Sequence, residues 1–90
     1  MANVLIVDDD AAIREALAEA LTDLGHTPSA VPGGEAGLSW LDRNRADAVL
    51  LDLRMPDMDG MEVLRRIRTR PKPPPVVILT AVPTSSQCGP

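Results

Sequence analysis

Residues 48–60 read AVLLDLRMPDMDG, and this stretch decides which fold the chain can form. Four apolar residues lead into Asp52, as expected of a short strand buried on both faces. Pro56 and Gly60 then favour a rigid turn over a continued strand. The stretch therefore predicts a carboxylate at the carboxyl end of a buried strand, where open α/β sheets bind their ligands.

Strand-like and helix-like segments alternate on both sides of this stretch. Apolar runs predict strands, and apolar residues at helical spacing predict helices. The strands are predicted within 3–10 and at 26–31, 48–52 and 76–80, and the helices at 11–25, 33–44 and 59–70. This order predicts an α/β domain with a parallel sheet. Pro28 indicates that the strand at 26–31 is an edge strand or an irregular one.

The helix at 11–25 has the clearest sequence signals. Asp10 is the predicted N-cap and Gly25 the predicted residue after the C-cap. Its apolar side is formed by four residues at helical spacing, Ile13, Leu17, Leu21 and Leu24.

Composition narrows the class of protein further. The chain has 90 residues, which allow one small domain, and a net charge of −4, which argues against non-specific binding to nucleic acid. The basic run at 65–72 is interpreted as a solvated helix end. A single cysteine, Cys88, excludes an intrachain disulfide or zinc set. No apolar run predicts a membrane span or signal peptide, so we expect a soluble, cytoplasmic protein.

Acidic residues follow two of the predicted strands. Asp8, Asp9 and Asp10 follow the first, and Asp52 ends the third. If these strands are parallel neighbours, the carboxylates gather and repel one another unless a cation is present, and Mg²⁺ prefers such oxygen ligands. The alternative is that each aspartate only caps a helix or shapes a turn, as we expect of Asp10 and Asp59. For Asp8, Asp9 and Asp52 together we favour a metal site.

Three motifs resemble the receiver domain of bacterial two-component response regulators. They are VLIVDDD at 4–10, LLDLRMPDMDG at 50–60 and VVILTA at 76–81, in the family's order and spacing. The resemblance covers residues 1–84 and implies the flavodoxin-like fold, a doubly wound parallel sheet with strand order 2-1-3-4-5.

The resemblance also implies a chemistry for these residues. Asp52 would be the phosphoacceptor, receiving a phosphoryl group from a sensor histidine kinase or a small phosphodonor. Asp9 and Asp52 would hold Mg²⁺, with Asp8 acting mainly through a bound water and Arg54 through its main-chain carbonyl. Thr80 would contact the phosphoryl group and move toward it as a switch.

The sequence departs from the family at its C-terminal end. Residues 85–90 do not resemble the helix expected there and are predicted to form a flexible tail outside a partial domain at 1–84. We expect the fold to be incomplete, without the family's fourth helix, fifth strand and fifth helix. The lysine and aromatic residue of that fifth strand are then also missing. The fourth strand would be an exposed edge, which predicts an oligomer, such as a homodimer through this strand, or a partly disordered monomer.

Two other functions compete with a phosphorylated receiver. A truncated fragment could keep the acidic site without phosphorylation and serve as an interaction or dimerisation module. An aspartate-nucleophile phosphatase is less compatible, because those enzymes place the nucleophile after the first strand. We therefore expect a signalling module and not an enzyme.

Overall fold

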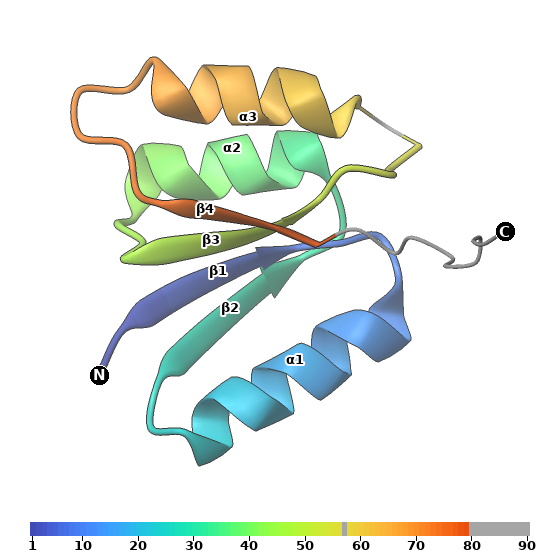
Figure 1. Ribbon diagram of the computed structural model, residues 1–90, viewed down its shortest axis with the longest axis vertical. Coiled ribbons are helices and arrows are strands. Elements are labelled where there is room, and N and C mark those ends of the chain that lie inside the picture. The colour runs from blue at the N-terminus through green and yellow to red at the C-terminus, as the bar shows by residue number, and fades with distance from the viewer. Residues whose placement is uncertain (57, 80–90) are drawn as a thin grey trace, which may run out of the picture.

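The computed structural model describes residues 1–56 and 58–79, which form one sheet and three helices (Figure 1). The elements are β1 (Asn3–Val7), α1 (Ala11–Asp23), β2 (Thr27–Val31), α2 (Gly34–Arg43), β3 (Ala48–Asp52), α3 (Gly60–Arg68) and β4 (Val76–Leu79). The strands are parallel and lie in the order β2-β1-β3-β4. The predicted α/β fold is confirmed, and this order matches the first four strands of the expected 2-1-3-4-5 sheet. The predicted tail at 85–90 lies outside the described residues.

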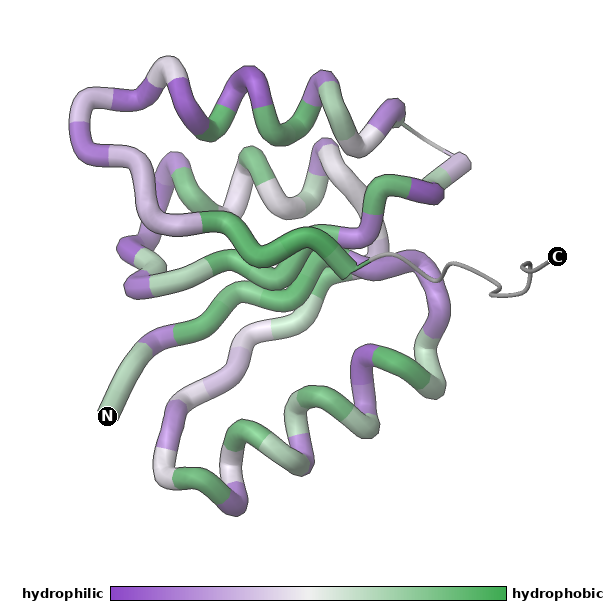
Figure 2. The backbone as a smooth tube through the Cα atoms, in the orientation of Figure 1, coloured by the Kyte–Doolittle hydropathy of each residue, from purple (hydrophilic) through white to green (hydrophobic). Residues whose placement is uncertain are grey.

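The main core lies between the sheet and two helices. α2 and α3 cover one face of the sheet, and α1 lies against the other (Figure 1). The buried residues on the two-helix side come from both central strands and both helices, and include Leu5, Val7, Val49, Leu51, Leu38, Val63 and Ile67. Figure 2 shows β4 and most of β1 and β3 as strongly hydrophobic, whereas β2 is paler. Unbroken apolar runs are expected of parallel strands covered on both faces.

The caps predicted for α1 are confirmed. The Asp10 side chain accepts hydrogen bonds from the backbone N–H groups of Ala12 and Ile13. Gly25 follows the C-cap with a φ of +90°, a conformation that favours glycine. The Asp10 hydrogen bonds fix where α1 begins, shortly after Asp8 at the end of β1.

The apolar side of α1 is less covered than its periodicity suggests. Ile13 is 38% exposed and Leu24 is 73% exposed. The reason is geometric, since α1 is the only described helix on its face of the sheet and lies toward β2 (Figure 1). None of the residues of α1 is buried, so this helix contributes less to the core than α2 and α3.

The weak strand at 26–31 forms at the edge of the sheet, as Pro28 indicated. β2 pairs only with β1 among the described strands, and Pro28 lies opposite Val4. None of the described helices is both long and apolar enough to cross a lipid bilayer.

Candidate metal and phosphoryl site

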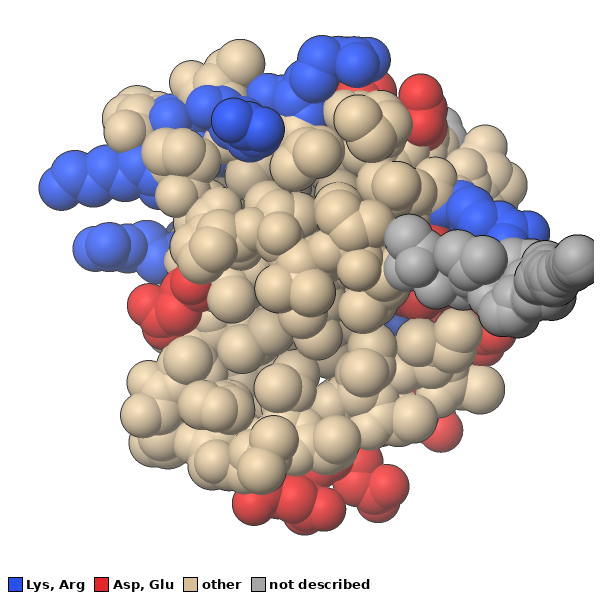
Figure 3. All heavy atoms as spheres, viewed as in Figure 1, with Lys and Arg blue, Asp and Glu red and all other residues tan. Residues whose placement is uncertain are grey.

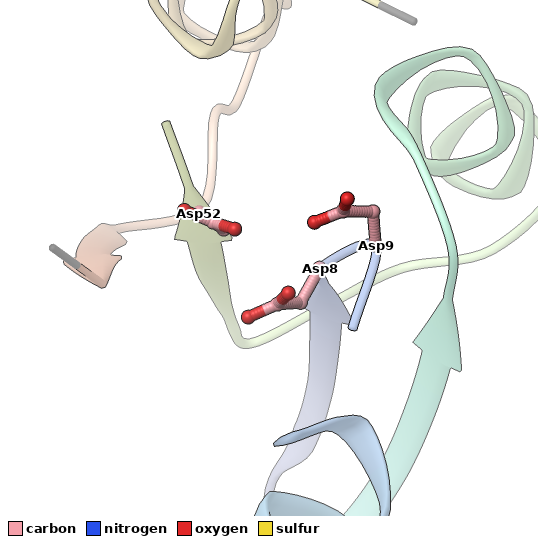
Figure 4. A group of neighbouring side chains, drawn as sticks. All are labelled: Asp8, Asp9 and Asp52. Atoms are coloured by element: carbon pink, nitrogen blue, oxygen red, sulfur yellow. The ribbon is translucent and has the colours of Figure 1, made fainter. Parts of the chain in front are cut away.

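The strand register brings the predicted acidic residues together. β1 and β3 are neighbours, with Val7 opposite Leu51, so the residues that follow them lie side by side at the same end of the sheet. One carboxylate oxygen each from Asp8, Asp9 and Asp52 lie within 4.8 Å of one another. Figure 4 shows the three side chains converging from the ends of the two strands. The sequence prediction that these acids form one cluster is confirmed.

The three carboxylates differ in their exposure to solvent. Asp8 is 2% exposed and Asp52 is 7% exposed, whereas Asp9 is exposed. Burial raises the pKa of the Asp8 carboxyl above its ordinary value, and the neighbouring carboxylates of Asp52 and Asp9 raise it further. A hydrogen bond from the backbone of Asp10 opposes these effects. Burial and the neighbouring like charges therefore both disfavour the ionised form of Asp8.

Backbone N–H groups orient the two buried carboxylates. The N–H of Asp10 donates to Oδ1 of Asp8 at 2.9 Å, and the N–H of Arg54 donates to Oδ1 of Asp52 at 3.0 Å. Each bond spans two residues and closes a tight turn directly after its strand. The aspartates are thus fixed by the same turns that end β1 and β3.

Arg14 is a residue of this site that the sequence analysis did not identify. Its guanidinium Nη1 donates to the main-chain carbonyl of Asp8 at 2.8 Å. The contact ties α1 to the end of β1 and brings a positive charge beside the acidic cluster. Helical spacing places Arg14 on a polar side of α1. Only the packing of α1 shows that the Arg14 side chain contacts the end of β1.

The loop after β3 is held close to the sheet by packing. Met55 is 8% exposed and belongs to the core. Gly60 begins α3 directly against Leu53, and a Cβ atom at Gly60 would collide with the Leu53 backbone. Asp59 caps α3 by accepting a hydrogen bond from the Met61 N–H, as predicted. The glycine is required here by close approach, which fixes the distance between α3 and the end of β3.

Two predicted site residues are not tested by this geometry. Thr80 lies outside the described residues, directly after the last residue of β4. The N–H of Arg54 brings its backbone beside Asp52, but the role of its carbonyl as a metal ligand stays a prediction.

The donor set fits a hard divalent cation. All three groups are carboxylates, two of them are buried, and their mutual repulsion is the kind that a bound cation relieves. Oxygen ligands without histidine or cysteine favour Mg²⁺, Mn²⁺ or Ca²⁺ over zinc or copper. The arrangement supports a metal site formed by Asp8, Asp9 and Asp52.

Comparison with known proteins gives a consistent result. Residues 4–88 match the family model described as the response regulator receiver domain. The transcriptional regulatory protein AfsQ1 of Streptomyces coelicolor is 44% identical over 81 residues, covering 90% of this chain and 36% of AfsQ1. The response regulator MprA of a Mycobacterium species is 41% identical over 78 residues, covering 87% of this chain and 34% of MprA. The chain thus spans about a third of these curated relatives.

Solved structures match over a larger share of their length. The N-terminal domain of a response regulator receiver protein from Methanoculleus marisnigri has a TM-score of 0.86 and 38% identity, covering 96% of this chain and 72% of that one. The response regulator protein TrrA of Thermotoga maritima was crystallised in complex with Mg²⁺-BeF. It has a TM-score of 0.86 and 36% identity, and the match covers 92% of this chain and 72% of the TrrA chain. These similarities extend over nearly all of the described residues.

Proposed function

Because this chain belongs to the response regulator receiver family, a family of signalling modules and not of enzymes, we propose that Asp52 is its phosphoacceptor. The observation that carries this proposal is the position of Asp52: it ends a central strand, is almost fully buried, and lies within the acidic cluster. Receiver domains accept phosphoryl groups in two-component signalling, and such a group must be received by a carboxylate of this chain.

The environment of Asp52 suits a carboxylate nucleophile. The hydrogen bond from the Arg54 N–H fixes one oxygen and so restricts the direction in which the other can face. In the proposed step an oxygen of Asp52 forms a bond to phosphorus, and the bond from phosphorus to the donor breaks with its electron pair leaving on the donor. Phosphoryl transfer depends mainly on positioning and charge stabilisation, which a rigid carboxylate and its neighbours provide.

We propose that Asp9 and Asp52 hold Mg²⁺, with Asp8 contributing through a bound water and Arg54 through its main-chain carbonyl. Mg²⁺ would neutralise charge on the carboxylates and on phosphoryl oxygens. The Asp8 side chain is oriented by the Asp10 N–H, and the main-chain carbonyl of Asp8 accepts a hydrogen bond from Arg14. These contacts hold residues 8–10, which we call the acidic loop, in place. The relative TrrA was crystallised with Mg²⁺-BeF, which supports the same chemistry here.

The remaining roles follow from the family. Response regulators are phosphorylated by sensor histidine kinases, and we propose such a kinase as the phosphodonor of this chain. Thr80, next to β4, is proposed to contact the phosphoryl group. We also propose that the chain works in the cytoplasm together with such a kinase.

The test is the intact mass of the protein after incubation with acetyl phosphate and Mg²⁺. We expect one phosphoryl adduct in the parent, which should be lost with EDTA and in Asp52→Asn. Asp47→Asn is the matched control, since Asp47 is exposed and precedes β3 at the other end of the sheet. An adduct that persists in Asp52→Asn, or none in folded parent protein, would exclude Asp52 as the acceptor.

A homodimer through β4 is a second proposal, which would allow an interaction role without phosphorylation. β4 is the edge of the described sheet, and Val77 within it is 51% exposed. An apolar edge strand can pair with a second copy. Sedimentation velocity should show a dimer that Val77→Lys converts to a monomer, and a monomeric parent would refute the proposal.

A further inference from the structure

Several basic residues of this acidic protein lie at the end of the sheet opposite the acidic cluster. Figure 3 shows blue side chains over α3 and where β3 and β4 begin, while acidic residues dominate α1. Arg65 and Arg66 pair with Glu62 on the exposed side of α3. Arg45 and Lys72 take part in no ion pair within the described chain, so their charges are available to a partner.

These unpaired cations face a cavity formed where α2 and α3 end. The cavity has a volume of about 240 Å³, and three of its lining residues are the cations Arg45, Arg70 and Lys72. No acidic residue is among the described residues that line it. Residues 45 and 70–72 are distant in sequence and meet because β3 and β4 are adjacent. We call this cavity the basic pocket.

Arg70 is a fixed part of the wall of the basic pocket. Its Nη2 donates to the Leu38 carbonyl at 3.2 Å and to Oδ1 of Asp42 at 2.9 Å. Its Nε is buried and has no hydrogen-bond partner in the described chain. Because Arg70 is ion-paired with Asp42, it shapes the wall of the pocket, and the unpaired charge comes from Arg45 and Lys72.

The other described residues that line the basic pocket are mostly apolar. They are Leu41, Ala46, Pro71 and Pro74, together with the polar Asn44. The volume corresponds to about eight water molecules at ~30 Å³ each, which is below the ~300–1,000 Å³ of drug-sized ligand sites. The pocket therefore has room for one or two side chains. Its mixture of cationic and apolar lining residues suits a ligand with an anionic group beside an aliphatic one.

We propose that the basic pocket binds an acidic segment of a partner protein, with a carboxylate side chain beside Arg45 and Lys72 and a neighbouring aliphatic side chain against the apolar lining residues. A protein segment is favoured over a nucleic acid because the net charge of −4 and the small size of the pocket do not provide an extended basic surface. The site lies at the other end of the sheet from Asp52 and shares no residue with the acidic cluster.

The test is a titration of ¹⁵N-labelled protein with the peptide acetyl-Leu-Glu-Glu-Leu-amide, followed by amide chemical shifts. We expect saturable shifts at Arg45, Ala46 and Lys72. Arg45→Gln/Lys72→Gln should weaken binding about tenfold, because two charged contacts are lost. Arg65→Gln/Arg66→Gln removes the same charge outside the pocket and should change affinity less than about twofold. The spectra also report whether each variant is folded.

Several outcomes would overturn the proposal. They are equal binding of acetyl-Leu-Gln-Gln-Leu-amide, equal weakening in both double variants, no saturable shift, or shifts centred on the acidic cluster. Tighter competition by a deoxythymidine oligonucleotide would assign the pocket to nucleic acid instead. Asp52→Asn should bind the peptide as the parent does, so failure of the phosphoacceptor proposal leaves this test unaffected.

Discussion

Asp8→Asn should make the protein more stable at pH 7 in the absence of divalent ions. Asp8 is 2% exposed, and its carboxylate lies in a cluster whose oxygens are within 4.8 Å of one another. Two unit charges 4.8 Å apart repel by about 1 kcal/mol at the dielectric constant of water and about 3.5 kcal/mol at an effective value of 20. Asp9 is exposed and its charge is screened, so Asp52 supplies most of the repulsion. We expect a gain of about 1–3 kcal/mol.

The pH dependence of this gain follows from the raised pKa of Asp8. The folded state holds the Asp8 proton more tightly than the unfolded chain, whose carboxyl has the ordinary value of 3.8. The parent therefore loses stability as the pH rises from about 3.8 through the raised pKa. The Asp8→Asn side chain does not titrate, so the advantage of the variant should be present at pH 7 and disappear in acid. The amide oxygen of the variant can still accept the hydrogen bond from Asp10.

Urea unfolding in EDTA at pH 7, followed by circular dichroism, measures this gain. In thermal unfolding, each kcal/mol should raise Tm by about 4–8 °C for a domain of this size. Glu19→Gln is the control, since it removes one charge from the exposed surface of α1. Mg²⁺ should stabilise the parent by mass action and the variant less. A variant no more stable than Glu19→Gln at pH 7 would refute the electrostatic reasoning.

Three further changes test the packing around the site. Gly60→Ala should lower the unfolding free energy by about 1–3 kcal/mol in urea, because its Cβ meets the Leu53 backbone; an unchanged midpoint would contradict this close approach. Arg14→Gln should cost about 1 kcal/mol through loss of the bond to the Asp8 carbonyl, and an equally stable variant would show that the bond is not formed in solution. Ile67→Val, at a side chain 1% exposed, should cost about 0.5–1.5 kcal/mol without changing the urea m-value, whereas a changed m-value would indicate altered compactness.

The acidic cluster could be predicted because it depends on local pattern and one general rule. Unbroken apolar runs identified β1 and β3 as buried strands, and parallel strands present their carboxyl ends at the same edge. The clustering of Asp8, Asp9 and Asp52 then depends on the adjacency of β1 and β3, which the structure supplies. The capping roles of Asp10 and Asp59 could be predicted equally well, because helix caps are determined by residues a few positions apart.

Other features depend on how elements pack, which periodicity does not report. Helical spacing showed which side of α1 is apolar but not that Ile13 and Leu24 on that side are exposed. The contact of Arg14 with the Asp8 carbonyl requires the angle at which α1 leaves β1. The basic pocket requires the β3–β4 pairing, which joins Arg45 to Lys72.

The sparse packing of α1 has a consequence for the order in which the molecule opens. A helix without buried side chains has little to lose on detaching, so its amides should exchange with solvent at a lower free energy than those of β1 and β3. Yet α1 and its N-cap include Arg14 and Asp10, which hold the acidic loop. The loop would then lose its order in the same sub-global opening as the helix. Any ion that binds the loop should slow exchange throughout α1, even at amides far from the ion.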